Sequence, residues 1–192
     1  MAILPAAQAE VEHRLDVVII GAGACGLCAG LAAKEAGAEV LLLERDARPT
    51  GSTTLSTGLI PAAGTRLQQQ YGIDDSAELF ARDIIAKAKN KNDAAMAQAI
   101  AAASGPTIDW LAEKHHIAFR LVEGFLYPGH SKLRMHGTPN RTGEELENAL
   151  LSAAAAASLD IITGALARDL YATAAGEVVA VRIERPDGRL ET

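Results

Sequence analysis

The sequence predicts an α/β protein organised around one dinucleotide-binding βαβ unit. The run from Val17 to Ile20 is short, continuous and β-branched, as is typical of a strand buried on both faces of a parallel sheet. The glycine pattern Gly21-Ala22-Gly23-Ala24-Cys25-Gly26 follows it directly, and a second apolar run, residues 39–43, ends at Glu44. A strand, a glycine-rich turn that opens a helix, and a second strand ending in an acidic residue together indicate a dinucleotide site.

The three glycines of this turn have separate roles. They permit a tight bend, a close approach of the backbone to a pyrophosphate, and close packing of the helix on the strand. The helix expected from Ala24 to Ala36, with Gly37 as its C-cap, would direct its free N–H groups and its dipole at the phosphates. The alternative interpretation is a glycine-rich turn in an ordinary α/β core.

Glu44 stands where dinucleotide-binding proteins place the residue that binds the adenosine ribose. Its carboxylate would accept hydrogen bonds from the ribose hydroxyl groups, whereas an arginine there would accommodate the 2′-phosphate of NADP. Because Arg45 follows directly, NADP remains an alternative at this point.

Composition excludes several classes of function. The formal net charge is −6, and no basic cluster is interleaved with aromatic residues, so we expect no nucleic-acid partner. No stretch reaches the roughly 20 apolar residues of a membrane span. The small number of cysteines fits a reducing cytoplasm, so we expect a cytoplasmic protein. Cys25 and Cys28, the two cysteines, are expected to pack within the helix rather than act as a redox pair. Residues 1–15 lack an export signal and are expected to form a flexible lead.

A segment dense in glycine, proline and hydroxyl side chains follows Glu44 and extends to Gly64. Such hydroxyl groups can bond phosphate or flavin oxygens, and Gly51 and Gly58 would let the backbone approach a flat ligand. A plain surface loop has the same composition.

Most of the chain resembles one flavoprotein family, which comprises fumarate reductases, succinate dehydrogenase flavoprotein subunits, L-aspartate oxidases and 3-ketosteroid dehydrogenases. The resemblance rests on the glycines spaced from Gly21 through Gly30 to Gly37, on Glu44-Arg45, and on the segment from Gly51 to Thr65. It continues in Gly129 to His136 and in Arg141-Thr142-Gly143.

The resemblance implies FAD bound in an extended pose by a Rossmann-like βαβ sheet with inserted helices and an antiparallel β-meander. It implies that Gly21, Ala22, Gly23, Ala24, Cys25 and Gly26 contact the pyrophosphate, that Glu44 and its neighbour Arg45 lie at the adenosine ribose, and that the backbone at Leu166 and Ala167 contacts adenine. Ser52, Thr53, Thr57 and Gly58 would lie near the flavin end. Covalently flavinylated members carry a histidine where Ser52 stands, and residues 51–64 contain none, so we expect non-covalent FAD.

Capping residues place the helices in the middle of the chain. Asp75-Ser-Ala-Glu78 predicts one helix start, and Thr142-Gly-Glu-Glu145 predicts another. Asp93 caps a further helix, which Ser104-Gly105-Pro106 is expected to break before a shorter one.

Two histidines and two cations lie in the expected loop of residues 124–136, namely His130, Lys132, Arg134 and His136. Their charge could hold an anionic substrate or a reduced flavin. No acidic residue or cysteine is near enough in sequence to complete a metal site, so we predict none.

The last part of the chain predicts strands. One covers residues 160–163, and three more, residues 165–173, 177–185 and 188–192, are expected to form a meander. The resemblance implies that residues 16–192 are the N-terminal part of an FAD-binding domain, with the capping domain and the C-terminal flavin segment lying beyond Thr192. It therefore implies a fragment of a longer enzyme or a truncated product, and it leaves the catalytic residues unknown.

The implied chemistry is hydride transfer between flavin N5 and a small-molecule substrate that has a C=C bond, or its saturated counterpart, next to a carbonyl or carboxylate. Two alternatives remain. One is a non-catalytic, truncated nucleotide-binding module. The other is an NAD-dependent Rossmann dehydrogenase, which predicts further βαβ units after Glu44.

Overall fold

A computed structural model describes residues 2–192 as two compact units. Unit 1 comprises residues 2–55 together with Leu150–Thr192, and unit 2 comprises Ser56–Ala149. Helix α5, Gly143–Ala156, begins in unit 2 and ends in unit 1.

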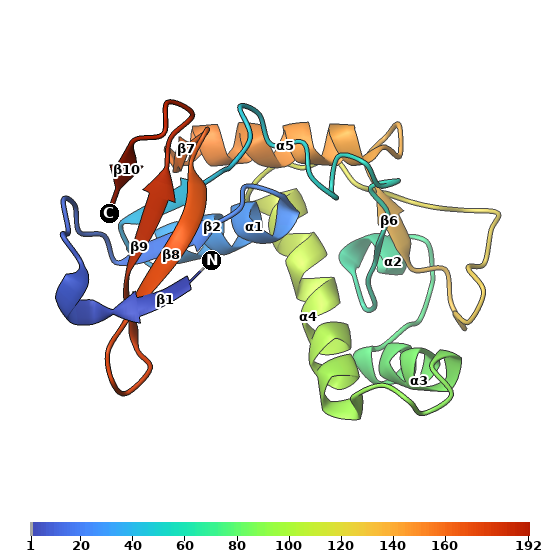
Figure 1. Cartoon of the computed structure of the whole chain (residues 1–192). Coiled ribbons are helices and arrows are strands. Elements are labelled where there is room, and N and C mark those ends of the chain that lie inside the picture. The colour runs from blue at the N-terminus through green and yellow to red at the C-terminus, as the bar shows by residue number, and fades with distance from the viewer. Residues whose placement is uncertain (1) are drawn as a thin grey trace. The chain divides into compact units, whose positions relative to one another are not determined.

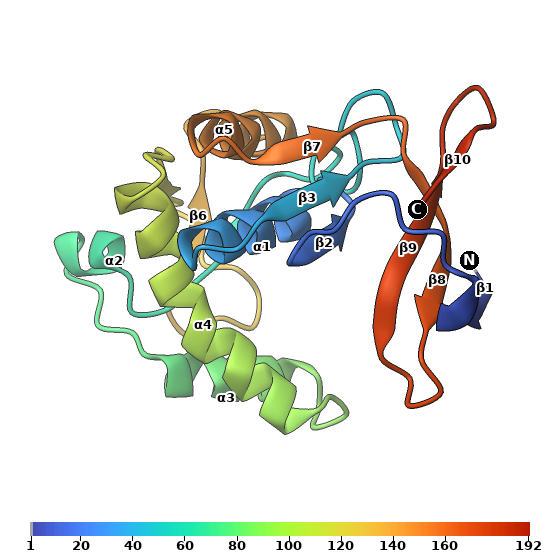
Figure 2. The same ribbon diagram turned by 90° about the vertical axis from the view of Figure 1, so that its left-hand side faces the viewer.

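Unit 1 contains the predicted βαβ core. Strands β2 (Val17–Ile20), β3 (Val40–Leu43) and β7 (Asp160–Ile162) form a parallel sheet in the order β2-β3-β7. Helix α1 (Ala24–Glu35) joins β2 to β3 and packs on both strands (Figure 2). The predicted fold class is confirmed.

Helix α1 lies close to the sheet because Gly30 has no side chain. A Cβ atom at Gly30 would come within 2.7 Å of Leu159 and 2.8 Å of Leu42, while Leu27 and Leu31 on the same helix are fully buried. A glycine inside a helix costs about 0.5–1 kcal/mol relative to alanine. Here the close packing of helix on strand offsets that cost.

The predicted meander is also present. It consists of strands β8 (Leu166–Ala172), β9 (Val178–Glu184) and β10 (Leu190–Glu191). Strand β9 pairs antiparallel with β8 and with β10. Residues 1–15 were expected to be a flexible lead, and residue 1 lies outside the described part of the chain. Within that lead, strand β1 (Ala2–Pro5) pairs in parallel with β8, and a short 3₁₀ turn over Ala6–Gln8 follows (Figure 1). Strand β1 pairs there because the edge of β8 that faces away from β9 has backbone N–H and C=O groups available for hydrogen bonding.

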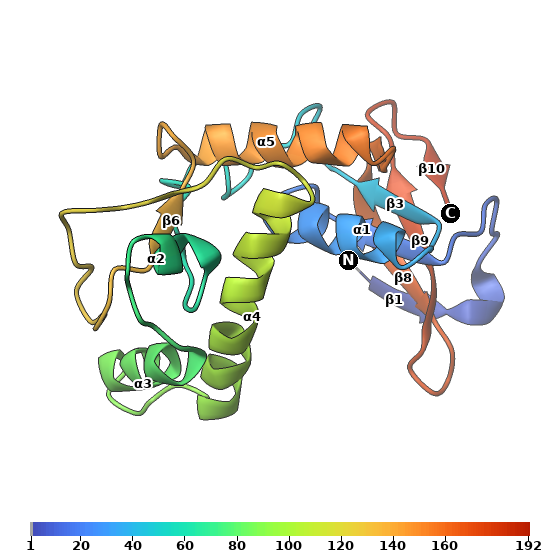
Figure 3. The same ribbon diagram turned by 180° about the vertical axis from the view of Figure 1, so that it is seen from behind.

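Unit 2 consists of helices and a small sheet. Its helices are α2 (Arg66–Gln70), α3 (Ala77–Lys87) and α4 (Ala94–Glu113), and α3 lies against α4 (Figure 3). Strands β4 (Ile60–Pro61), β5 (Arg120–Leu121) and β6 (Met135–Gly137) pair antiparallel in the order β4-β6-β5. The sequence did not predict this sheet, because strands of two or three residues leave no periodic pattern.

The predicted break at Ser104-Gly105-Pro106 is wrong, since α4 runs through it. The helix continues because this stretch packs against residues 62–64. Gly105 lies so close that a Cβ atom there would come within 2.2 Å of the Ala63 carbonyl oxygen, and the Ser104 hydroxyl accepts the Ala63 N–H at 3.3 Å. Proline inside a helix costs about 3 kcal/mol, which these tertiary contacts outweigh.

Within residues 2–192, no helix is both long and apolar enough to cross a membrane. In the same residues, no group of three or more His, Cys, Asp or Glu side chains is placed to hold a metal ion.

Strand β2 stands at one end of its sheet, and its apolar residues Val18 and Ile20 are 40% and 51% exposed. An apolar edge strand is a template for intermolecular pairing. We therefore expect Val18→Lys to reduce aggregation of the purified chain, measured by light scattering during concentration. Met96→Lys is the matched control, because Met96 is 59% exposed but lies in helix α4 and not in a strand. Equal effects of the two substitutions on scattering would contradict an edge-specific cause.

Candidate functional site

The glycine turn after β2 is fixed by backbone hydrogen bonds and by close contact of Gly26 with the backbone of the bend. The Gly21 N–H donates to the Leu43 carbonyl at 2.7 Å, which extends the β2–β3 ladder by one residue. Gly21 then bends the chain at φ +100°, a conformation that favours glycine. A Cβ atom at Gly26 would lie 1.9 Å from the Gly21 carbonyl oxygen, so the first turn of α1 rests directly on the backbone of the bend.

Glu44 is held at the carboxyl end of β3 by both its backbone and its side chain. Its N–H donates to the Ile162 carbonyl, and its own carbonyl accepts the Ala165 N–H, both at 2.8 Å. One carboxylate oxygen accepts the Ala22 N–H at 3.0 Å, and the other accepts the Asp46 N–H at 2.9 Å. The predicted ribose-binding carboxylate is thus attached to the glycine turn itself.

Two amide groups at the start of α1 have hydrogen-bond partners in unit 1. Gly23, the N-cap residue, has no side chain to cap the helix. The Ala24 N–H donates instead to the hydroxyl group of Thr53 at 3.0 Å, and the Leu27 N–H donates to the Gly23 carbonyl at 2.9 Å. Between them lie the amides of Cys25 and Gly26, at the positive end of the helix dipole.

The residues present fit the diphosphate and ribose of a dinucleotide. A Cβ atom at Gly26 would collide with the backbone of the turn, the first turn of α1 has no acidic residue, and the Glu44 carboxylate lies within hydrogen-bonding distance of the Ala22 amide. An anion such as pyrophosphate is favoured at such a helix start.

The other predicted cofactor residues are placed as follows. The Arg45 side chain is exposed and pairs with Asp46, with 3.2 Å between Nε and Oδ1. Cys25 is an exposed free thiol, and Ser52 is exposed in the loop after β3. Ala167 lies in β8, two residues after the Ala165 amide that bonds to Glu44.

Thr57 and Gly58, also predicted near the flavin, belong to unit 2. Gly58 has φ +63°, and a Cβ atom there would come within 2.5 Å of the Thr142 carbonyl oxygen. The Gly143 N–H at the start of α5 donates to the Ser56 carbonyl at 2.9 Å. In this unit, Gly58 therefore permits close contact between the loop and the beginning of α5.

The prediction that Arg134 could bind an anion is wrong. Its side chain is fully buried, pairs with Asp75 at 2.7 Å and with Asp83, and lies over the Phe80 ring at 4.7 Å from the ring centre. Two carboxylates neutralise its charge. The sequence did not show this, because Asp75 and Asp83 are far from Arg134 along the chain.

His136 is likewise committed to internal partners. Its Nδ1 donates to the Arg134 carbonyl at 2.9 Å, so its Nε2 accepts the Thr65 hydroxyl at 2.9 Å. The side chain is fully buried, and this burial holds its pKa below the ordinary value of 6.5. His136 is therefore a neutral structural residue and not an anion ligand.

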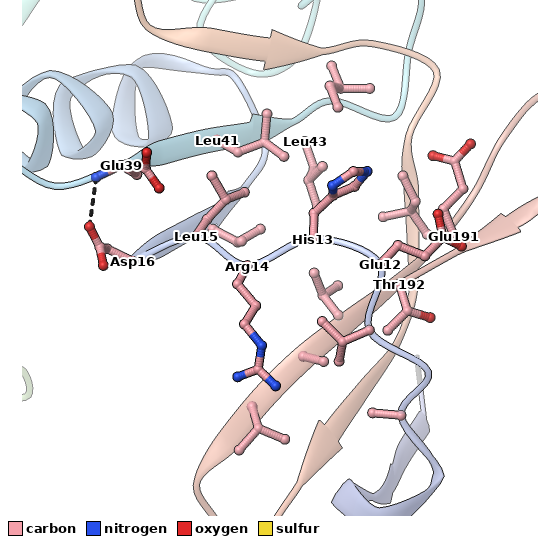
Figure 4. Close-up of a pocket in the computed structure, with 18 of the residues that line it drawn as sticks. Glu12, His13, Arg14, Leu15, Asp16, Glu39, Leu41, Leu43, Glu191 and Thr192 are labelled. Carbon is pink, nitrogen blue, oxygen red and sulfur yellow. Dashed lines mark hydrogen bonds between the residues drawn. The ribbon is translucent and has the colours of Figure 1, made fainter.

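A pocket of about 880 Å³ lies elsewhere in unit 1. Val18, Leu41 and Leu43 line it, whereas Ile19 and Leu42 approach α1, so the pocket is on the sheet face opposite that helix. Figure 4 shows residues 12–16 crossing it, with Asp16 accepting the Glu39 N–H. None of the predicted cofactor residues lines this pocket.

Comparison with known proteins identifies the family. A family model described as FAD binding domain matches residues 16–192. The chain belongs to this FAD-binding family. Among curated relatives, urocanate reductase of Eggerthella lenta is 34% identical over 131 residues, which are 68% of this chain and 22% of that protein. Fumarate reductase (cytochrome) of Shewanella frigidimarina is 35% identical over 107 residues, 55% of this chain and 19% of that protein.

Solved structures of flavoproteins share the fold of this FAD-binding chain. The open conformation of a flavocytochrome c3 fumarate reductase has a TM-score of 0.86 and 26% identity, covering 97% of this chain and 33% of that one. The 3-ketosteroid-Δ4-(5α)-dehydrogenase of Rhodococcus jostii RHA1 has a TM-score of 0.84 and 24% identity. The match covers 100% of this chain and 46% of that one. The chain spans about a fifth of the length of the curated relatives named above.

The buried polar groups of unit 2 predict a loss of stability in acid. Burial opposes ionisation of Asp75, but hydrogen bonds from Arg134 and Gln68 and the charge of Arg134 outweigh it and hold its pKa below the ordinary 3.8. For both Asp75 and His136 the folded pKa is lowered, so the unfolded chain binds more protons and stability falls as pH falls. We expect the urea midpoint to drop below about pH 6.5 as unfolded His136 titrates, and again below about pH 4 as Asp75 does.

A substitution separates the histidine contribution to this acid sensitivity. His136→Gln should reduce the change in urea midpoint between pH 7.5 and 5.5, because glutamine does not titrate in this range. A midpoint that does not move between pH 7.5 and 5.5 in the wild-type chain would refute the assignment of a neutral buried His136.

Proposed function

We propose that this chain is the FAD-binding part of an oxidoreductase that reduces, or forms, a C=C bond next to a carbonyl or carboxylate. The proposal rests mainly on the geometry at the N-terminus of α1. There, a glycine-rich turn, the amides of Cys25 and Gly26, and the Glu44 carboxylate suit the diphosphate and ribose of FAD. The match of residues 16–192 to the FAD-binding family supports the same cofactor.

The protein would hold FAD without a covalent bond. Residues 51–64, the hydroxyl-rich segment, contain no histidine that could attach to the flavin. Backbone amides of Gly21 to Gly26 would bind the pyrophosphate, and Glu44 would orient the ribose. Bound FAD supplies hydride transfer at N5, while the protein positions it and excludes competing reactions.

The names of the relatives support the substrate class. Several relatives are named as reductases of urocanate or fumarate, and both compounds carry a C=C bond conjugated to a carboxylate. A substrate of this class would need cationic groups near its carboxylate. Arg134 does not serve, because Asp75 and Asp83 neutralise it. Because the chain spans about a fifth of the length of these relatives, we propose that further substrate-binding and catalytic groups of the whole protein lie outside these 192 residues.

The alternatives have less support. An NAD-dependent Rossmann dehydrogenase would continue into another βαβ unit after β3, whereas here a loop and the helices of unit 2 separate β3 from β7. A non-catalytic nucleotide-binding module would use the same glycine turn, so only turnover by the whole protein distinguishes it from the proposed enzyme.

The phosphate-binding role of the turn can be tested by one substitution and a matched control. Gly26→Ala would place a methyl group 1.9 Å from the Gly21 carbonyl oxygen and displace the turn. With two charge-assisted hydrogen bonds lost, FAD affinity should fall roughly hundredfold, measured by quenching of flavin fluorescence. Gly30→Ala, in the same helix, meets only the ends of Leu159 and Leu42, so it should lower stability by about 1–3 kcal/mol and keep the wild-type affinity. Wild-type FAD affinity in Gly26→Ala would refute this site.

The enzyme assignment is tested on the protein purified from its own source. A native mass spectrum should show one bound FAD that denaturation releases. Once this flavin has been reduced with dithionite, an unsaturated carboxylate such as fumarate or urocanate should reoxidise it. Flavin that stays attached after denaturation would overturn the non-covalent assignment. Bound flavin that no unsaturated carbonyl compound or carboxylate reoxidises would favour the non-catalytic module.

A further inference from the structure

We propose that Thr53 is a positioning residue for the phosphate-binding turn, and that it provides, from the loop after β3, the helix cap that Gly23 cannot. The inference rests on the proposed binding of FAD at this turn. From the sequence, Thr53 was expected near the flavin. The proposed role is instead to hold the phosphate-binding turn in position.

The need for an external cap follows from the residue at the start of α1. A helix leaves its first N–H groups without partners, and a side-chain oxygen on the N-cap residue usually accepts one of them. Thr65, Ser76 and Asp93 do so for α2, α3 and α4, each accepting an N–H from the third helical residue. Gly23 has no such oxygen, and the Thr53 hydroxyl instead accepts the N–H of Ala24, the first helical residue.

The turn and the capping side chain fit each other closely. A Cβ atom at Gly23 would lie 3.3 Å from the Thr53 oxygen, so a larger residue there would press on the hydroxyl group that replaces its cap. Gly23 therefore serves two purposes: it permits the approach of phosphate and leaves room for Thr53. Both residues lie in unit 1, and the bond ties the loop of residues 51–55 to the turn.

This bond affects the amides that would bind phosphate. Ala24 directly precedes Cys25 and Gly26, whose N–H groups are the ones left for the ligand. With the Ala24 amide already held, the following peptide units are fixed before the ligand arrives. Binding then costs less ordering, which is how preorganisation raises affinity.

The neighbouring threonine provides a matched control. Thr54 belongs to the same loop, and its hydroxyl oxygen is buried without a hydrogen-bond partner among residues 2–192. Thr54→Val thus removes the same chemical group from the same loop with no bond to lose. Thr53→Ser keeps the capping oxygen and serves as the conservative rescue.

The experiment has two readouts. The first is hydrogen exchange of the Ala24 amide in the FAD-free protein, measured by NMR. Thr53→Val should speed this exchange, while Thr53→Ser and Thr54→Val leave it at the wild-type rate. The second is FAD affinity, which should weaken about fivefold in Thr53→Val, the usual effect of losing a cap, and stay near wild type in the other two variants.

Each result decides between distinct explanations. If Thr53→Val binds FAD as tightly as the wild type, or more tightly, the hydroxyl group competes with phosphate or is irrelevant, and the positioning role is overturned. Equal losses in Thr53→Val and Thr54→Val would also overturn it. If the wild-type chain binds no FAD, the proposed function fails, while faster Ala24 exchange in Thr53→Val alone still confirms the cap.

Discussion

The four hydrogen bonds of Glu44 hold together the part of the molecule on which the site depends. Its backbone groups bond to the Ile162 carbonyl and the Ala165 N–H, so they attach the end of β3 to β7 and to the start of the meander. Its carboxylate bonds to the Ala22 and Asp46 amides, so it attaches the same point to the glycine turn. Hydrogen bonds to a charged acceptor are about twice as strong as neutral ones. One residue therefore fixes the turn, the strand end and the expected ribose position relative to each other.

Close backbone contact is the second constraint, and it explains why glycines recur along one stretch. Gly26 rests on the carbonyl group of the bend, Gly30 rests on Leu42 and Leu159, and Gly23 leaves space for the Thr53 hydroxyl. Each glycine weakens α1 in isolation, because glycine has a low helix propensity. The helix is stabilised instead by burial of Leu27 and Leu31 against the sheet. The phosphate-binding geometry and the packing of the helix thus require the same small residues.

Unit 2 shows how a cluster of charged residues can have a structural purpose. The Arg134 side chain lies fully buried between Asp75 and Asp83. Removing one partner of such a group leaves an uncompensated buried charge, which costs several kcal/mol, about 3–5. The hydrogen bonds of His136, to the Arg134 carbonyl and to Thr65, extend this network through β6 to the start of α2. Arg134 is thereby fixed to the helices of unit 2, and its charge is not available to a ligand.

The sequence by itself determined the βαβ unit, the meander and most helix starts. These features depend on neighbours in the chain: a β-branched run, glycines at fixed spacing, turn residues, and capping side chains such as Asp93 and Thr142. Only the tertiary structure decided which partner each polar group has. Thr53 caps a helix that precedes it, Arg134 pairs with two distant carboxylates, α4 continues through Pro106, and β1 pairs with β8. Such pairings join residues far apart in the chain, and no local pattern records them, because burial and hydrogen bonding are satisfied by whichever groups the fold brings together.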